Sequence, residues 1–129
     1  MNFEDEKDYL MRIIKEMVRI LFSLMFGKRY VSVEREIRNR YEISGNDLND
    51  LLSLIDQGHV NTAENILLSS IDYGNKNDVA FAALFYQYLS EKEEDFLTQC
   101  DYTREEVLEG MKELAGKAGY GNIIHILES

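Results

Sequence analysis

The chain has 129 residues, 45% of them hydrophobic and 29% charged, with no Pro, no Trp and one Cys. This composition is typical of an ordinary globular protein, and we expect residues 1–129 to form a single all-helical domain. The net charge of −10 disfavours nucleic acid and anionic lipid as partners, because both are bound through Lys and Arg. Cys100 has no second cysteine to pair with, and the N-terminus lacks a signal-peptide pattern, so we expect a cytoplasmic protein.

The charge is divided unevenly along the chain. Residues 7–40 hold nine basic and four acidic side chains, whereas residues 41–129 hold five basic and seventeen acidic ones. Only the first third of the chain could therefore bind an anionic partner. The basic residues that lie near Tyr30 and Tyr41 are Lys28, Arg29, Arg35, Arg38 and Arg40. A solvated connection that pairs with the acidic body explains them more simply than nucleic-acid binding does.

The first predicted element is a long amphipathic helix over residues 4–26. Its polar residues recur at spacings of three and four and form a narrow stripe, so apolar residues cover more than half of its circumference. Gly27 ends this helix. Residues 28–45 are interpreted as a charged connection, in which Tyr30, Val31 and Val33 favour an extended piece and residues 34–40 could continue as a short helix.

A helical body is expected over residues 46–129. Its first helices span 47–57, with Asn46 as N-cap and Gly58 as stop, and 60–72, which ends at Gly74. Asp78 is the expected cap of a helix over 79–89, which is apolar nearly all round and should form the centre of the core. A short helix near Phe96 comes next. The residues expected to face the core from the first two helices are Leu48, Leu51, Leu52, Ile55, Ala63, Ile66, Leu67 and Ile71.

The C-terminal part carries a capping-box pattern. Thr103 and Glu106 have the spacing of that motif and precede a helix that ends near Gly116. Further glycines after this helix make the chain more flexible. The apolar residues expected in a final docked turn or two are Ile123, Ile124, Ile126 and Leu127.

The stretch from Leu51 to Ile71 resembles a tetratricopeptide-type helix hairpin. An apolar first helix is followed by Gly58 in the tight turn and, five residues later, by Ala63, where the second helix must approach the first closely. The resemblance implies stacked helical hairpins over about residues 47–100.

The following segment repeats this pattern only in part. Phe81, Leu84 and Tyr88 stand at the large, aliphatic and aromatic positions of the first helix of such a unit. Lys92 and Leu97 replace the turn glycine and the small residue, and the closing proline is absent. The fold expected from these patterns is all-α, with about six helices: a long N-terminal amphipathic helix followed by tetratricopeptide-like hairpins.

The whole chain also resembles a family of small, acidic, all-helical proteins of Firmicutes bacteria, a domain of unknown function. The segments that carry this resemblance are EDEKDYLMRIIKEMVRILFSLMFGK, LIDQGHVNTAENILL, AALFYQYLSEK and YTREEVLEGMKELA. The resemblance implies an all-helical fold, and it implies no activity and no catalytic residue.

Residues that usually carry chemistry are not grouped in this sequence. His59 and His125 are far apart and lack further ligands at helical spacing, so we expect no metal site. Cys100 lacks the signature of a nucleophile and is expected to be a small buried or half-buried hydrophobe. The glycines between Gly116 and Gly121 follow a helix instead of a strand, which makes a phosphate-binding loop a poor interpretation. We therefore expect no catalytic residue, no cofactor and no enzyme.

The remaining function is a non-catalytic protein–protein interaction module, an adaptor or regulatory protein with a protein or peptide partner. The apolar end of the first helix must be covered by the protein's own helices, by a second copy in a homodimer, by a partner or by lipid. Aromatic residues of the body could line a groove for a peptide or could equally belong to the core. The partner-binding candidates are Leu21, Phe22, Met25, Tyr73, Phe85, Tyr86 and Tyr88.

Two alternatives from other classes stay open. One is a peripheral membrane protein anchored through the N-terminal amphipathic helix, which the acidic body disfavours. The other is an enzyme with no recognisable motif, which would need a pocket with convergent polar groups.

Overall fold

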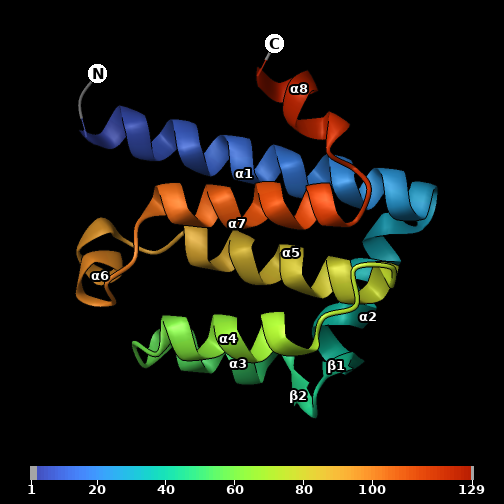
Figure 1. The fold of residues 1–129 in the computed structure, drawn as a ribbon, viewed down its shortest axis with the longest axis horizontal. Coiled ribbons are helices and arrows are strands. Elements are labelled where there is room, and N and C mark those ends of the chain that lie inside the picture. The colour runs from blue at the N-terminus through green and yellow to red at the C-terminus, as the bar shows by residue number, and fades with distance from the viewer. Residues whose placement is uncertain (1–2, 129) are drawn as a thin grey trace.

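The computed structural model describes residues 3–128, and the side chains of residues 6–125 and 127. The fold is all-α, with one very short pair of strands (Figure 1). The elements in chain order are α1 (Phe3–Phe26), the 3-10 turn η1 (Gly27–Arg29), α2 (Tyr30–Arg40), β1 (Glu42–Ile43), β2 (Asn46–Asp47), α3 (Leu48–Asp56), α4 (Val60–Ser70), α5 (Lys76–Ser90), α6 (Glu94–Gln99), α7 (Arg104–Lys117) and α8 (Asn122–Glu128).

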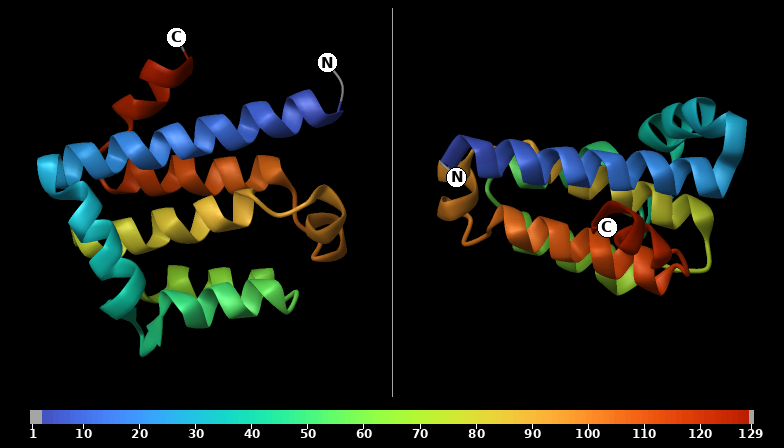
Figure 2. Two further views of the ribbon diagram at one scale, coloured as in Figure 1. Left: turned by 180° about the vertical axis from the view of Figure 1, so that it is seen from behind. Right: turned by 90° about the horizontal axis from the view of Figure 1, so that it is seen from above.

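Helix α5 lies at the centre of the molecule. All residues from Asp78 to Tyr86 are buried, because α1 and α7 pack on one side of α5 and α3 packs on the other (Figures 1 and 2). The expectation that this helix forms the centre of the core is confirmed. An almost wholly apolar helix needs cover on most sides, and four neighbouring elements supply it.

The wide apolar face of α1 is covered by the protein's own helices. Leu21 is 0%, Phe22 1% and Met25 6% exposed, since α1 contacts α5, α7, α8 and α2. Burial of these three candidate partner-binding residues against the chain's own body means that they belong to the core in this fold. The face is wide because several helices pack around it.

Residues 28–45 are mostly helical. The helix considered for residues 34–40 is present and begins earlier, at Tyr30, which corrects the extended piece expected around Tyr30, Val31 and Val33. Gly27 adopts φ +59° and ends α1, and after one 3-10 turn the chain forms α2 as a helix of eleven residues. Ile37 is buried and Val33 packs against the same core one turn earlier, so an apolar face of helical spacing outweighs the strand preference of β-branched residues.

A two-residue turn links the only strands within the described residues. Ser44 and Gly45 have φ of 54° and 79°, which is the type I′ geometry that suits a tight hairpin. Glu42 pairs with Asp47 and Ile43 with Asn46. The Ser-Gly pair was the signal in the sequence for this hairpin.

Thr103 is the N-cap of α7, as predicted, and accepts from the amide of Glu106 over 3.1 Å. The two other predicted cap residues of the body helices need correction. Asp47, and not Asn46, is the N-cap of α3, where it forms a reciprocal capping box with Asp50. Asn75, and not Asp78, is the N-cap of α5. Asp78 lies in the first turn of the helix and is buried.

Helices α3 and α4 form an antiparallel hairpin, as the tetratricopeptide comparison implies. Gly58 adopts φ +89° in the turn and Ala63 is fully buried. The second expected hairpin does not form, because α5 packs mainly against α1 and α7 and α6 is a short helix of six residues.

Candidate functional site

A hollow of about 220 Å³ opens between α4 and α7, with Tyr86 of the central helix α5 in its lining. Figure 1 shows α5 between these two helices. We call this hollow the acidic groove. Its lining residues are Glu64, Leu68, Tyr86, Tyr102, Glu106, Glu109, Gly110 and Glu113.

The acidic side of the groove follows from the helical period of α7. Glu106, Glu109 and Glu113 are separated by three and four residues, so they lie on one face of the helix. Met111 and Leu114, on the opposite face, are buried in the core. The same amphipathic pattern that docks α7 therefore turns a row of carboxylates toward the groove.

The floor of the groove is held by two tyrosines that share one carboxylate oxygen. The hydroxyl of Tyr86 donates to Oε2 of Glu64 over 2.7 Å, and the hydroxyl of Tyr102 donates to the same atom over 3.1 Å. Burial, and then the neighbouring Glu64 carboxylate, raises the pKa of both phenols well above the usual range. Both phenols therefore stay protonated and keep Glu64 in place, and no described residue donates to Oε1 of Glu64.

Gly110 brings the backbone of α7 directly onto the floor. A Cβ at this position would lie 2.6 Å from Cε1 of Tyr86. The missing side chain thus leaves room for the Tyr86 ring between α7 and α4.

The groove carries negative charge that the described residues do not neutralise. None of their ion pairs involves Glu64, Glu106, Glu109 or Glu113. No three His, Cys, Asp or Glu side chains of the described part are grouped as metal ligands either. Glu106, Glu109 and Glu113 follow one another along one face of α7, an arrangement that suits several cationic groups of an extended partner.

The volume of the hollow also favours side chains of a protein partner over an enclosed small molecule. A volume of about 220 Å³ is below the roughly 300–1,000 Å³ of sites that enclose small molecules. It has room for side chains of a protein partner. Leu68, 41% exposed on α4, adds an apolar contact beside the carboxylates.

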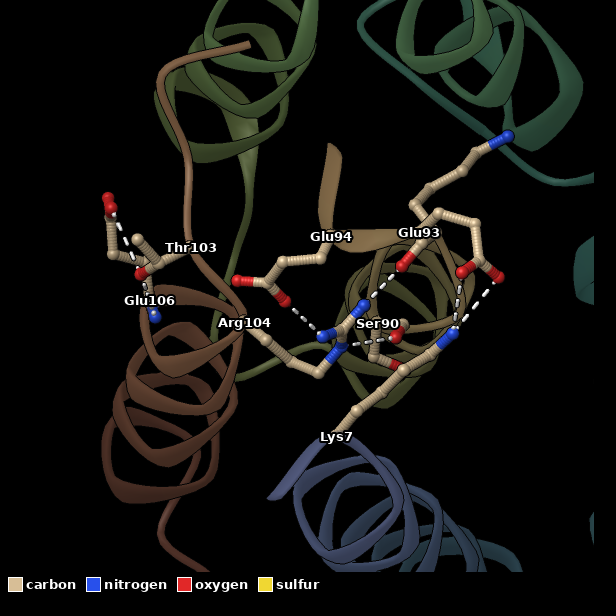
Figure 3. A network of polar contacts seen from close by, with 8 residues as sticks. Lys7, Ser90, Glu93, Glu94, Thr103, Arg104 and Glu106 are labelled. Carbon is tan, nitrogen blue, oxygen red and sulfur yellow. Dashed lines mark hydrogen bonds and ion pairs between the residues drawn. The ribbon is translucent and has the colours of Figure 1, made fainter. Parts of the chain in front are cut away.

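A second polar cluster joins α1, the α5–α6 turn and the start of α7 (Figure 3). The guanidinium of Arg104, 1% exposed, donates to the carbonyl of Ser90 over 3.0 Å, to Glu94 over 2.7 Å and to the carbonyl of Lys92. Lys7 points at Glu93 from α1 and pairs with it over 2.9 Å. Arg104 uses its donors within the fold, so this cluster ties elements together and is structural.

Another hollow, of about 260 Å³, lies where α1 meets α2. Arg29 and Arg40 line it together with Glu36, so its charge is mixed. Tyr41, also in its lining, already donates its hydroxyl to Asp78. This hollow carries no uniform charge that would define a partner.

The four aromatic candidates do not form one groove. Tyr86 lines the acidic groove, whereas Phe85 is fully buried in the core. Tyr88 donates to Asp56 of α3 over 2.7 Å, and Tyr73 lies under the ammonium group of Lys117, 5.3 Å from its ring centroid. Residues 85, 86 and 88 point in different directions because successive side chains of an α-helix are rotated by about 100°.

Sequence reasoning missed most of the acidic groove. The signal that could have found one wall of it is the spacing of Glu106, Glu109 and Glu113, which places three carboxylates on one face of a helix. Nothing in the sequence places Glu64 and Tyr102 beside that face, because they are brought there by the packing of α4 and α7 around α5.

Comparison with known proteins gives a family and no activity. A family model, described as a family of unknown function (DUF6483), matches residues 4–119. No curated protein and no solved structure matches the chain. Within residues 3–128, no helix combines the length and the apolar character needed to cross a membrane.

Proposed function

The chain belongs to this family of unknown function, and we propose that it is a non-catalytic cytoplasmic interaction module that binds a basic segment of a partner protein in the acidic groove. The observation that carries the proposal is the groove itself, where four carboxylates without a described cation surround a tyrosine floor. A protein partner with Lys or Arg side chains supplies the missing charges.

The spacing of the carboxylates defines the ligand further. Glu106 and Glu113 are seven residues apart on α7, which corresponds to about 10 Å along a helix. A partner helix with cations at i, i+4 and i+7 matches this span. One apolar side chain of that helix would pack on Leu68 at the rim.

The interaction should be fast and sensitive to salt. Exposed carboxylates attract a basic partner over about 10 Å at 0.1 M ionic strength and over less at higher salt. Such charges contribute more to the association rate and to specificity than to affinity. A module that binds and releases partners quickly fits an adaptor role.

Two finer expectations stay predictions. One is the tetratricopeptide kinship of the α3–α4 hairpin, which the turn at Gly58 and the buried Ala63 support. The other is the bacterial, Firmicutes origin of the family, which rests on the resemblance alone.

The test is a binding measurement on the full chain. The probe is a fluorescein-labelled helical peptide with Lys at i, i+4 and i+7 around one Leu, and a second peptide carries Glu at the same positions. Fluorescence anisotropy should show salt-dependent binding of the Lys peptide only. The double variant Glu109→Lys, Glu113→Lys should weaken that binding about tenfold or more.

A matched control separates the groove from net charge. Asp8→Lys with Glu91→Lys makes the same change in net charge on exposed residues outside the groove. This control should bind the Lys peptide almost as wild type does. Equal weakening by both double variants, or equal binding of the Glu peptide, would contradict the proposal.

A further inference from the structure

The corner between α1 and α2 combines basic and exposed apolar side chains. Leu24 is 56%, Val31 52% and Tyr30 38% exposed. We call this surface the basic corner. Its residues are Leu24, Lys28, Arg29, Tyr30, Val31 and Arg35.

The cations of the basic corner are not neutralised locally. Neither Lys28, Arg29 nor Arg35 takes part in an ion pair among the described residues. Of the acidic residues of α2, Glu34 pairs with Arg38, and Glu36 lines hollows with Arg29 and with Arg35 but forms no ion pair among the described residues. Residues 28–40 still hold five basic and two acidic side chains. A chain of net charge −10 therefore keeps a local positive surface that holds three of its exposed large apolar residues.

The acidic groove has the complementary properties. It holds carboxylates without a described cation, and Leu68 is the exposed large apolar residue on its rim. Lys28, Arg29 or Arg35 of a corner could face Glu109 and Glu113 while an apolar corner residue covers Leu68. The corner thus offers cations to the carboxylates of the groove, and the groove offers carboxylates to the cations of the corner.

The two surfaces lie on different sides of the molecule. The basic corner lies at one end of the long axis, and α7 runs from its start beside α6 at the other end back toward the corner end (Figure 1). Seen from above, α2 and α7 lie on opposite sides of α1 (Figure 2). The corner of a chain therefore cannot fill its own groove, whereas it can reach the groove of another chain.

We propose that the occupant of the acidic groove is the basic corner of a second copy of this chain, so that copies join head to tail. The proposal rests on the proposed function of the groove and names its partner. Each joined copy leaves one free corner and one free groove, so the assembly grows with concentration into open chains or closes into a ring. Salt weakens it because the contact is between exposed charges.

Two complementary variants of the full chain test this arrangement. The groove variant, Glu109→Lys with Glu113→Lys, keeps an intact corner. The corner variant, Lys28→Glu with Arg29→Glu, keeps an intact groove. Because all four positions are exposed, both variants should fold, which circular dichroism checks. Sedimentation velocity at low salt then measures the size of each protein and of their equimolar mixture.

The expected pattern is specific to a head-to-tail contact. Wild type should sediment faster as its concentration rises, and each variant alone should remain monomeric, with self-association weakened about tenfold or more. The mixture should associate again, since the intact corner of one variant meets the intact groove of the other, and the two reversed surfaces also carry opposite charges. The controls Asp8→Lys with Glu91→Lys and Arg12→Glu with Lys15→Glu, also on exposed residues, should associate as wild type does.

Other outcomes overturn the proposal, and they do so separately from the function of the groove. Wild type that stays monomeric at every concentration at low salt, or a mixture that fails to associate, removes the second copy as occupant. If the Lys peptide still binds wild type but not the groove variant, the groove remains a protein-binding site for another partner. Binding of the corner to phosphatidylserine vesicles by a monomeric wild type would assign the corner to lipid instead.

Discussion

The backbone of α7 at Gly110 lies directly against the ring of Tyr86. A Cβ on Gly110 would lie 2.6 Å from Cε1 and 2.7 Å from Cζ of that ring. Replacing this glycine by alanine should therefore destabilise the fold, although alanine favours a helix interior by about 1 kcal/mol. The Tyr86 ring is buried and hydrogen-bonded to Glu64, so it cannot move freely. We expect Gly110→Ala to lower the free energy of unfolding by about 1–2 kcal/mol in urea denaturation.

Gly116 offers a control in the same helix. A Cβ at this position would meet nothing within 4 Å, so only the helix preference remains. Gly116→Ala should raise the free energy of unfolding by up to about 1 kcal/mol. Equal stabilisation of the protein by both substitutions would contradict a close contact between Gly110 and the Tyr86 ring.

Arg104 should be the most sensitive charged residue of the chain. Its buried guanidinium serves two backbone carbonyls and Glu94 at once. Arg104→Met leaves these acceptors without their donor and should cost about 3 kcal/mol or more. Arg38→Met, which breaks an exposed pair with Glu34 on α2, should change stability by less than about 1 kcal/mol. Similar losses in chemical denaturation would refute the structural role of Arg104.

Tyr41 should contribute to the alkaline limit of stability. Burial, and then its hydrogen bond to Asp78, raises the pKa of Tyr41 from 10.0 to about 12. Since the folded state holds this proton more tightly, the contribution is complete below pH 10 and is lost as pH rises toward 12. Tyr41→Phe should lower the unfolding free energy at pH 8 by about 1.5–3 kcal/mol. It should also flatten the pH dependence between 10 and 12, and an unchanged slope in urea titrations would contradict this.

The carboxylates of the acidic groove should lower the stability of the free protein. Glu109 and Glu113 are like charges at i and i+4, a pair that costs about 0.2–0.5 kcal/mol at low salt. Glu109→Gln with Glu113→Gln should therefore raise the melting temperature, and added NaCl should stabilise this variant less than wild type. Asp8→Asn with Glu91→Gln is the control. A salt response that is the same in all three proteins would show that the groove is not charged as described.

Local patterns in the sequence were enough to predict most helices of the fold. The apolar periods of α1, α3 and α7 and the glycine stop at Gly58 each depend on near neighbours in the chain. Residues 30–40 were harder to interpret, because Val31 and Val33 favour a strand locally and only the packing of Ile37 makes the helix.

The candidate site depends on contacts between distant residues, which a single sequence does not reveal. Asp78 has the residue type of a helix cap, yet it is buried and accepts hydrogen bonds from Tyr41 and from the amide of Asp72. Glu64 likewise has an ordinary surface character until Tyr86 and Tyr102, 22 and 38 residues away, are folded onto it. The spacing of the glutamates on α7 could have indicated an acidic stripe, but not its role as one wall of a groove.

The most direct test of the acidic groove is a map of the amides that respond to a basic ligand. Uniformly ¹⁵N-labelled full-length protein is titrated with the Lys peptide, and the amide chemical shifts are followed by NMR. If the peptide binds in the acidic groove, the largest changes should fall on α4 around Glu64 and Leu68 and on α7 from Glu106 to Glu113. Changes concentrated on α1 and α2, or spread evenly over all acidic surfaces, would contradict binding in the groove.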